Sequence, residues 1–243
     1  MFKLIDELQL FRGQDYIINE HITIHQPTLN EICDFGELRY YNMVYILTAT
    51  PSQYKVPLFD MGVDYESISD FDLFILLSKH FTFEDTSILF GNLDFSKFEL
   101  MFNEDKQPIL IDFENDIAID NMIYTFIVDY IRAIHFIEKQ VDKAGNAHTK
   151  QYLIDRERRQ LERKSKKQQK SVLIPLISAM TNCEQFKYNH DDVWNLHIYV
   201  FNDSVRRIQK IKNYDQVMQG AYSGCIDLKK IELESISWLG NLD

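Results

Sequence analysis

Three carboxylates that follow an apolar run are the residues whose types and spacing come nearest to a catalytic centre. Asp112, Glu114 and Asp116 come directly after residues 109–111, which are apolar. Acidic residues at the end of a strand often bind a metal ion, so a metal-dependent, nuclease-like enzyme is one interpretation. The same alternation is typical of a half-exposed strand end, and no second acidic or lysine element of recognisable spacing accompanies it. We therefore favour a structural role and expect no metal site.

The histidines offer no better metal site. His21 and His25 stand four residues apart in an expected strand, which separates them by about 13 Å along one face. His190 and the two aspartates after it could supply ligands, but the same residues suit the start of a helix, where carboxylates favour the positive end of the dipole. His197 stands among apolar residues of an expected helix. There we expect a hydrogen-bonded core or boundary side chain.

Sequence motifs for catalysis are absent from the chain. It contains no GxxxxGK[ST] or GxGxxG motif for phosphate binding, no GxSxG motif for a serine nucleophile and no HExxH motif for zinc. The three cysteines, Cys33, Cys183 and Cys225, are widely spaced and odd in number, so we expect buried free thiols. We infer that the protein is not an enzyme and has no cofactor.

A basic segment at residues 149–170 is the feature with a plausible binding role. It contains nine basic and three acidic residues, a balance of +6, within a chain of formal net charge −11. The rest of the chain therefore carries −17. The candidate partner-binding residues of this segment are Arg156, Arg159, Arg163, Lys164, Lys166 and Lys167.

The basic segment predicts an exposed helix. It lacks Gly and Pro and is rich in good helix formers, but it has too few apolar residues to bury a full stripe. It could bind nucleic-acid phosphates, an acidic protein or the acidic body of another copy, or it could be a solvated connector. Because the −17 body would repel a polyanion, nucleic acid is disfavoured. We favour a projecting connector that contacts an acidic partner, and we expect the main binding surface on the acidic body.

The composition predicts a folded, largely helical protein. Hydrophobic residues make up 45% and aromatic residues 13% of the chain, which is enough for a core. Only 8 glycines and 5 prolines favour long helices over many short strands. No run of about 18 apolar residues could span a membrane, and the acidic N-terminus does not fit a signal peptide. We expect a cytoplasmic protein whose aromatic residues lie mainly in the core, with some lining a groove for a partner helix.

Local signals in the first half predict one hairpin and several helices. Residues 15–25 form the hairpin. A capping box of Thr28 and Glu31 starts a helix that runs to about residue 47, with a break possible at Gly36. Shorter helices follow at about residues 51–61, 69–77 and 84–90.

The second half begins with another hairpin and is otherwise helical. Residues 98–102 and 108–112 predict the hairpin, and Asp120 with Asn121 starts a core helix that extends to about Lys139. Further helices are expected at residues 171–180, from Asn189 or His190 to about 208, and at 215–222. The pattern predicts an α+β fold that is predominantly α-helical. Its parts are an N-terminal lobe with small β-hairpins and helices (1–140), a linker and long basic helical connector (141–170) and a C-terminal helical lobe (171–243).

Several stretches together resemble a known phage family. They are residues 22–28, 31–37, 48–52, 60–62, 143–146 with the basic helix, 186–194, 203–208, 213–215 and 220–224. As a set they resemble the tail assembly chaperone group of tailed bacteriophages and prophages of Gram-positive bacteria, whose genes lie near the tape-measure gene. The resemblance covers most of the chain, and no catalytic signature belongs to this group.

The resemblance implies a non-enzymatic viral protein that acts in the cytoplasm of the host bacterium. Tail assembly chaperones coat the helical, aggregation-prone tape-measure protein until tail-tube subunits polymerise around it. The implied partners are the tape-measure protein or other tail proteins, and self-association is compatible with this role. The alternatives are a structural virion component, such as a tail, baseplate or neck subunit, and a nucleic-acid-binding protein that uses the basic helix.

Overall fold

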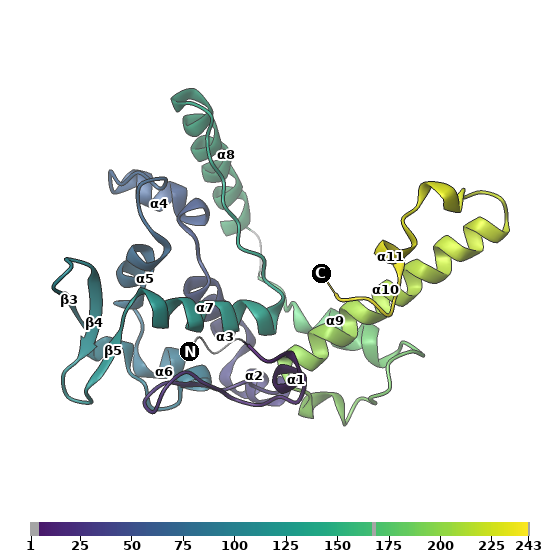
Figure 1. Ribbon diagram of the computed structural model, residues 1–243, viewed down its shortest axis with the longest axis horizontal. Helices are drawn as coiled ribbons and strands as arrows, with labels where there is room; N and C mark the ends of the chain where they lie inside the picture. Colours follow the sequence, from purple (N-terminus) through teal and green to yellow (C-terminus); the bar gives the residue numbers. More distant parts are fainter. Residues whose placement is uncertain (1–4, 167–168, 243) are drawn as a thin grey trace.

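The computed structural model of the protein describes residues 5–166 and 169–242 (Figure 1). It is 56% helical, and its strands form one two-stranded and one three-stranded antiparallel sheet. The predominantly helical α+β fold that the sequence predicts is therefore confirmed.

The helices and strands have the following bounds, with 3-10 helices written η. The first part of the chain forms α1 (Glu7–Phe11), β1 (Tyr16–Ile17), β2 (Thr23–Ile24), α2 (Leu29–Phe35), α3 (Glu37–Leu47), η1 (Pro51–Tyr54), α4 (Lys55–Asp60), α5 (Asp70–Ser78), α6 (Phe83–Phe90), η2 (Phe95–Lys97), β3 (Glu99–Phe102), β4 (Pro108–Asp112), β5 (Ile117–Ile119) and α7 (Asn121–His135). The second part forms α8 (Ala147–Ser165), α9 (Leu173–Thr181), η3 (Val193–Asn195), α10 (Ile198–Tyr222), η4 (Leu228–Lys230) and α11 (Leu233–Ile236).

Side-chain caps start the early helices where the sequence predicts them. Thr28 Oγ1 accepts a hydrogen bond from the Glu31 N–H at 3.2 Å, and Glu31 accepts one from the Thr28 N–H at 2.7 Å, which completes the capping box of α2. Asp120 accepts two backbone N–H hydrogen bonds at the start of α7. Gly36 has φ 99°, which glycine adopts without strain, and it separates α2 from α3. The predicted break is therefore confirmed.

Both predicted hairpins form, and the second belongs to a larger sheet. β1 pairs with β2, and β3 pairs with β4. A third strand that the sequence pattern does not predict, β5, pairs along the other edge of β4 and places Ile119 opposite Leu110. Both side chains are buried in the main core. β5 is only three residues long, so the burial of its side chains in the core, more than a local sequence signal, makes this segment a strand.

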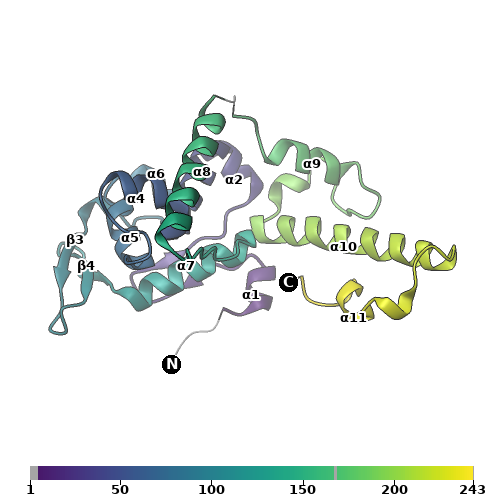
Figure 2. The same ribbon diagram turned by 90° about the horizontal axis from the view of Figure 1, so that it is seen from above.

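α7 is the central helix of the core, as the sequence predicts. Ile127, Ile131 and Ile134 are fully buried, and Tyr130 stacks on Tyr16 of the first hairpin with ring centroids 4.8 Å apart. The same cluster continues into α9 and α10, and α7 and α10 follow one another along the length of the molecule (Figure 2). The first and last thirds of the chain thus share one core. The division at residues 140 and 170 stays a prediction.

The start of α10 differs from the prediction. The chain forms only a short 3-10 turn after Asn189, and α10 begins at Ile198. Between them His197 is extended, and its Nδ1 lies 2.6 Å from the Gln26 carbonyl oxygen, while the Ile198 N–H donates to the Pro27 carbonyl at 2.9 Å. These contacts with the N-terminal part hold the segment out of the helical conformation. Residues 215–222, predicted as a separate helix, belong to the same α10.

The basic helix α8 projects from the body next to α4, as Figure 1 shows. One face is docked: Ile154 is buried in a second hydrophobic cluster with Leu58 of α4. Lys150 pairs with Glu66 at 2.9 Å, and Arg158 pairs with Asp60. The segment is therefore helical and projecting, as predicted, but it is packed along one side.

Two further expectations concern the burial of the cysteines and the absence of a membrane-spanning segment. All three cysteines are free, but Cys33 and Cys225 are exposed and Cys183 is only half-buried, so the expectation of buried thiols is wrong. Cys33 lies on the solvent side of α2, whose buried residues are Leu29 and Ile32. Within the described ranges, none of the helices combines the length and the apolar character needed to cross a membrane.

Candidate functional site

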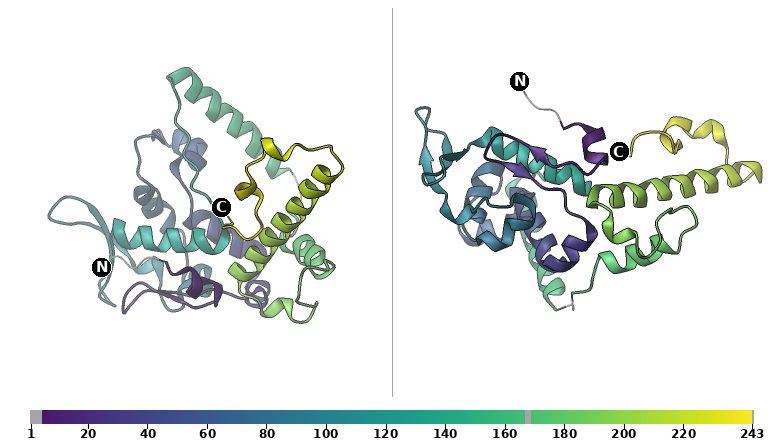
Figure 3. Two further views of the ribbon diagram at one scale, coloured as in Figure 1. Left: turned by 45° about the vertical axis from the view of Figure 1, so that its right-hand side comes forward. Right: turned by 90° about the horizontal axis from the view of Figure 1, so that it is seen from below.

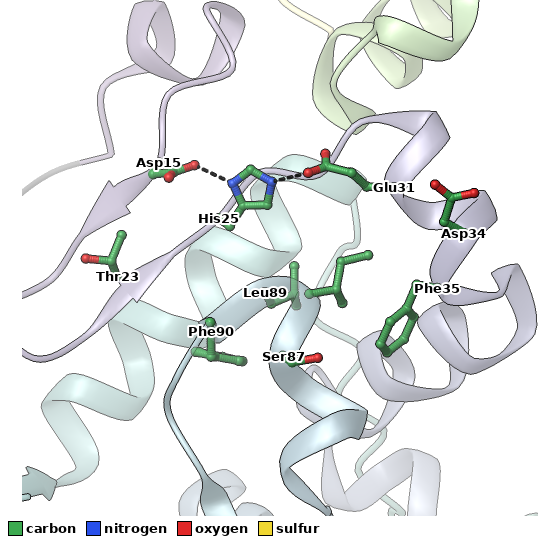
Figure 4. Close-up of a pocket in the computed structure, with 11 residues that line it drawn as sticks. Asp15, Thr23, His25, Glu31, Asp34, Phe35, Ser87, Leu89 and Phe90 are labelled. Carbon is green, nitrogen blue, oxygen red and sulfur yellow. Dashed lines mark hydrogen bonds and ion pairs between the residues drawn. The ribbon is translucent and has the colours of Figure 1, made fainter.

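One cavity, of about 600 Å³, lies where the first hairpin meets α2 and α6 (Figure 4). Asp15 and His25 line it from the hairpin and Glu31 from α2. His25 Nδ1 lies 2.8 Å from Asp15 Oδ1, and its Nε2 lies 3.2 Å from Glu31 Oε1. Both imidazole nitrogens are therefore engaged by carboxylates. The ring joins the hairpin to the start of α2.

Among the described residues that line this cavity, no nucleophile is hydrogen bonded to a base. Ser87 lines it, but the Ser87 hydroxyl donates to the Glu84 carbonyl oxygen at 3.3 Å, and not to His25. The pKa of Glu31 lies below its ordinary value. Burial by itself would raise this pKa, but the hydrogen bonds from Thr28 and the neighbouring His25 outweigh the effect of burial. Glu31 is thus an ionised capping residue. The arrangement stabilises local structure.

Two of the three carboxylates at the end of β4, those of Asp112 and Glu114, have structural roles, and the third, Asp116, is exposed in the turn with φ 55°. Asp112 is buried, and its carboxylate accepts hydrogen bonds from the N–H groups of Glu114 at 3.0 Å and Asn115 at 3.2 Å, and from Asn115 Nδ2 at 2.6 Å. Burial raises the pKa of Asp112, but these hydrogen bonds bring it below its usual value. Glu114 pairs with Lys97 at 2.7 Å. Among the residues described, no three His, Cys, Asp or Glu side chains are placed to hold a metal ion.

The candidate residues of the basic segment lie at the solvent surface. Arg156, Arg159, Arg163 and Lys164 are exposed on α8, and Lys166 is exposed directly after it. Lys167 lies outside the described residues. The structure thus presents Arg156, Arg159, Arg163 and Lys164 on one projecting helix. Arg156 also lines a cavity of about 380 Å³ together with Lys55 and Asp142 of the body.

A larger groove, of about 1040 Å³, runs between α1, α7, α10 and residues 241–242. We call it the α1–α10 groove. Leu8 and Phe11 line it from α1 and are exposed, whereas Leu10 is buried and anchors this short helix to the core. Phe136 and Tyr199 also line it and stack with ring centroids 5.1 Å apart, and Phe11 meets Tyr199 edge to face with centroids 6.5 Å apart. The groove therefore offers an apolar surface built from three separate elements.

Phe136 shapes this groove by ending α7. The sequence predicts a helix to about Lys139, but Phe136 adopts the left-handed conformation with φ 53°, so α7 ends at His135. A non-glycine residue pays for this conformation with about 1–2 kcal/mol. Its ring is held between Tyr199 and the Arg206 guanidinium, whose Cζ lies 4.6 Å from the ring centroid. These tertiary contacts offset the strain and explain the early end of the helix.

Charges of both signs border the apolar wall. Arg132 donates to the Thr48 carbonyl at 2.9 Å, but its buried Nε finds no acceptor among the described residues. Asp203 also lines the groove. Burial raises the pKa of Asp203, and the nearby Arg207 opposes this effect without cancelling it. Arg132 is thus held inside the structure, with 11% of its side chain exposed, whereas Glu138 and Lys139 are exposed and supply charges of both signs to the groove lining.

The C-terminal residues close one end of the groove. We call residues 237–242 the C-terminal strap; it lies back along α10, as the left view of Figure 3 shows. Arg207 donates to the carbonyl oxygens of Trp238 at 2.6 Å and Gly240 at 2.7 Å, and Arg206 donates to that of Leu242 at 3.0 Å. The strap is thus held through its backbone by side chains of α10.

Sequence reasoning did not find this groove. It placed the aromatic residues of the first half mainly in the core, with some lining a groove for a partner helix, and most of them, including Tyr40, Phe74 and Phe95, are buried as expected. The groove aromatics come from positions 11, 136 and 199. A weak local signal was available, because α1 is too short to bury the apolar residues on both of its sides.

Comparison with known protein families gives a match for the C-terminal third of the chain. Residues 164–243 match the family model of the YomV second domain, a phage-derived family. The matched region contains α9, α10, α11 and the strap, so it supplies one wall of the α1–α10 groove. No curated protein and no solved structure matches the chain. The last third of the chain is therefore similar to a phage-derived domain, which supports a phage-related protein.

Proposed function

We propose that this protein is a non-enzymatic phage tail assembly factor that binds a helical segment of the tape-measure protein in the α1–α10 groove. The observation that carries the proposal is the apolar groove itself, in which Leu8 and Phe11 remain exposed beside the Phe136–Tyr199 stack. The similarity of residues 164–243 to a phage-derived domain supports a phage context. The resemblance of many stretches to tail assembly chaperones supports this particular role.

The groove suits an amphipathic helix better than a small ligand. Its volume of about 1040 Å³ reaches the upper end of the range for small-molecule sites, about 300–1,000 Å³. A helix that is bound in a groove presents apolar residues at positions i, i+3, i+4 and i+7 to the floor and charged residues to the rim. The aromatic residues of the groove and the charged side chains of Glu138, Lys139 and Asp203 that line it fit both requirements.

Net charge and reversibility also suit an assembly factor. The net charge of −11 would keep a complex with an aggregation-prone client soluble in the host cytoplasm. A groove lined by exposed, separate apolar side chains makes many moderate contacts. Such contacts allow release when tail-tube subunits compete for the client.

Co-expression with the tape-measure protein tests this function. We expect the wild type to raise the soluble fraction of the client and to co-purify with it. A Leu8→Asp, Phe11→Asp variant should lose both effects, because the charges enter the apolar floor. A Met61→Asp, Ile174→Asp variant is the matched control, since these apolar residues are equally exposed but lie outside the groove. If the wild type neither solubilises nor co-purifies with the client, the proposal fails.

Purified virions separate this role from the main alternative. A structural tail, baseplate or neck subunit stays in the finished particle, whereas an assembly factor of the proposed kind does not. Mass spectrometry of purified particles should therefore not detect the chain. Stoichiometric amounts in the particle would contradict the proposal and favour a virion component.

A further inference from the structure

The two faces of α8 are used differently. The face that carries Ile154 is buried against α4, and Lys150 and Arg158 at its borders pair with acids of the body. The other face carries Arg156, Arg159 and Arg163. At 100° per residue these three lie within about 40° of the direction opposite Ile154. We call them the outer basic stripe.

The outer basic stripe has no partner in the described part of the chain. Its three side chains are exposed, and none forms an ion pair there, whereas Lys150 and Arg158 do. Arg156 and Arg159 are three residues apart and Arg159 and Arg163 four apart, spacings at which like charges destabilise an isolated helix. Tyr152 lies on the same side and is also exposed. An acidic surface would relieve this repulsion.

An acidic surface of matching charge lies on the second sheet. Residues 94–120 contain eight acidic and two basic residues, a balance of −6, which equals the +6 of the basic segment in size. Some of these acids are engaged in turns and caps, but Glu99, Glu104 and Asp105 are exposed and form no ion pair within the described residues. We call these three the acidic hairpin surface.

The acidic hairpin surface also bears exposed apolar side chains on an edge strand. In the part of the chain that the structure describes, β3 pairs with β4 alone, and all four of its residues are exposed, including Leu100 and Phe102. An unpaired edge with exposed apolar residues favours contact with another chain. Guanidinium groups can bind carboxylates and also stack on aromatic rings such as Phe102.

We infer that copies of this protein associate head to tail, with the outer basic stripe of one copy on the acidic hairpin surface of the next. Both surfaces are present on each chain, with opposite charge. β3 and β4 lie at one end of the molecule and α8 projects elsewhere, as Figures 1 and 2 show, and no ion pair joins them within the described residues. The contact joins two different surfaces, so each added copy leaves a free surface of each kind.

Sedimentation velocity of the full chain tests the inference. We expect the average sedimentation coefficient to rise with protein concentration at about 0.05 M salt. It should stay constant at about 0.5 M salt, because exposed ion pairs are weak and screened. An Arg156→Glu, Arg159→Glu, Arg163→Glu variant should associate at least about tenfold more weakly. The matched control Lys187→Glu, Lys229→Glu, Lys230→Glu has the same net charge and should associate as the wild type does.

Charge exchange gives the decisive arm of the experiment. A Glu99→Lys, Glu104→Lys, Asp105→Lys variant should also fail to associate alone. An equimolar mixture of this variant and the stripe variant should associate again, since each supplies the charge that the other requires. Circular dichroism checks that both are folded. The inference is overturned if the wild type stays monomeric at low salt, if the stripe variant associates as strongly as the wild type, or if the mixture of folded variants does not associate.

The same variants separate a second copy from nucleic acid as the occupant of α8. A gel-shift assay with single- and double-stranded DNA at low salt should show no retardation by the wild type. Retardation that the stripe variant loses, without any self-association of the wild type, would assign the stripe to phosphate binding and overturn the inference.

Discussion

The Tyr40 hydroxyl donates a hydrogen bond to Nε2 of His135 at 2.9 Å, between residues 95 positions apart in the chain. The direction follows from the other ring nitrogen: Nδ1 lies 2.7 Å from the Ile131 carbonyl oxygen, which can only accept, so Nδ1 carries the proton. The imidazole is therefore neutral and fully hydrogen bonded. It links α3 to the end of the central helix α7.

This neutral imidazole predicts a loss of stability in mild acid. Desolvation lowers the pKa of His135 to about 4. Its unfolded value is about 6.5, so the unfolded chain binds more protons between these values and stability falls as the pH falls through that window. The contribution lost between pH 7 and pH 5 is about 2 kcal/mol. Urea unfolding at both pH values should show this loss in the wild type and a smaller loss in His135→Gln. Equal losses in the two proteins would contradict the assignment.

Gly13 lies where the N-terminal segment contacts His197, just before α10, and we expect it not to tolerate a side chain. It has φ +70°, and an added Cβ would lie 2.1 Å from Cδ2 of His197. Gly13→Ala should therefore destabilise the fold by about 2 kcal/mol or more, through backbone strain and overpacking. Gly62→Ala is the matched control, because Gly62 has φ +75° with nothing within 4 Å of the added atom. Thermal unfolding should show a clearly smaller loss of stability for Gly62→Ala. Equal losses of stability in the two variants would exclude a steric clash with His197 as the cause.

Ile154 should anchor α8 to the body. Ile154→Ala removes a side chain that is 2% exposed in the cluster with Leu58, so the expected cost is about 2–4 kcal/mol for the unit that includes α8. Trypsin should then cleave the basic helix faster at native conditions. Leu161→Ala, in the same helix but exposed, should change stability by less than about 0.5 kcal/mol. Unchanged cleavage in Ile154→Ala would show that the docking contributes little.

Asp112 should contribute to stability and not to metal binding. Asp112→Asn keeps the shape but cannot accept all the hydrogen bonds from the turn, so a loss of about 1–2 kcal/mol is expected at pH 7. Asp116→Asn is the control, since Asp116 is exposed with φ 55°, which Asn tolerates. A chelator should leave the unfolding temperature of the wild type unchanged. Stabilisation by Mg²⁺ or Mn²⁺ that requires Asp112 would support a metal site instead.

The lowered pKa of Asp112 adds a second acid-sensitive contribution. Its folded pKa lies below the unfolded value, so its stabilising effect is present above the unfolded pKa and is lost as the pH falls through the folded one. This window lies below that of His135. The stability difference between Asp112→Asn and the wild type should therefore stay constant between pH 7 and pH 5, and it should shrink only at lower pH, where the wild-type carboxylate becomes protonated.

The sequence by itself determined those elements that depend on residues within four positions of each other. Thr28 and Glu31 close their capping box across three residues, Asp120 starts α7 through its own first turn, and Gly36 breaks the helix by its backbone conformation. The two hairpins and the helical state of the basic segment also follow from short-range patterns. Such signals survive in any tertiary context, because the partners are neighbours in the chain.

Tertiary structure alone decided where α7 ends, where α10 begins and which side of α8 is docked. Phe136 leaves the helix because its ring packs on Tyr199, and His197 stays extended because Gln26, 171 positions away, lies against its ring. β5 and the α1–α10 groove likewise form from segments distant in sequence. No local pattern encodes these contacts, since their energy exists only once the core has brought α1, α7 and α10 together.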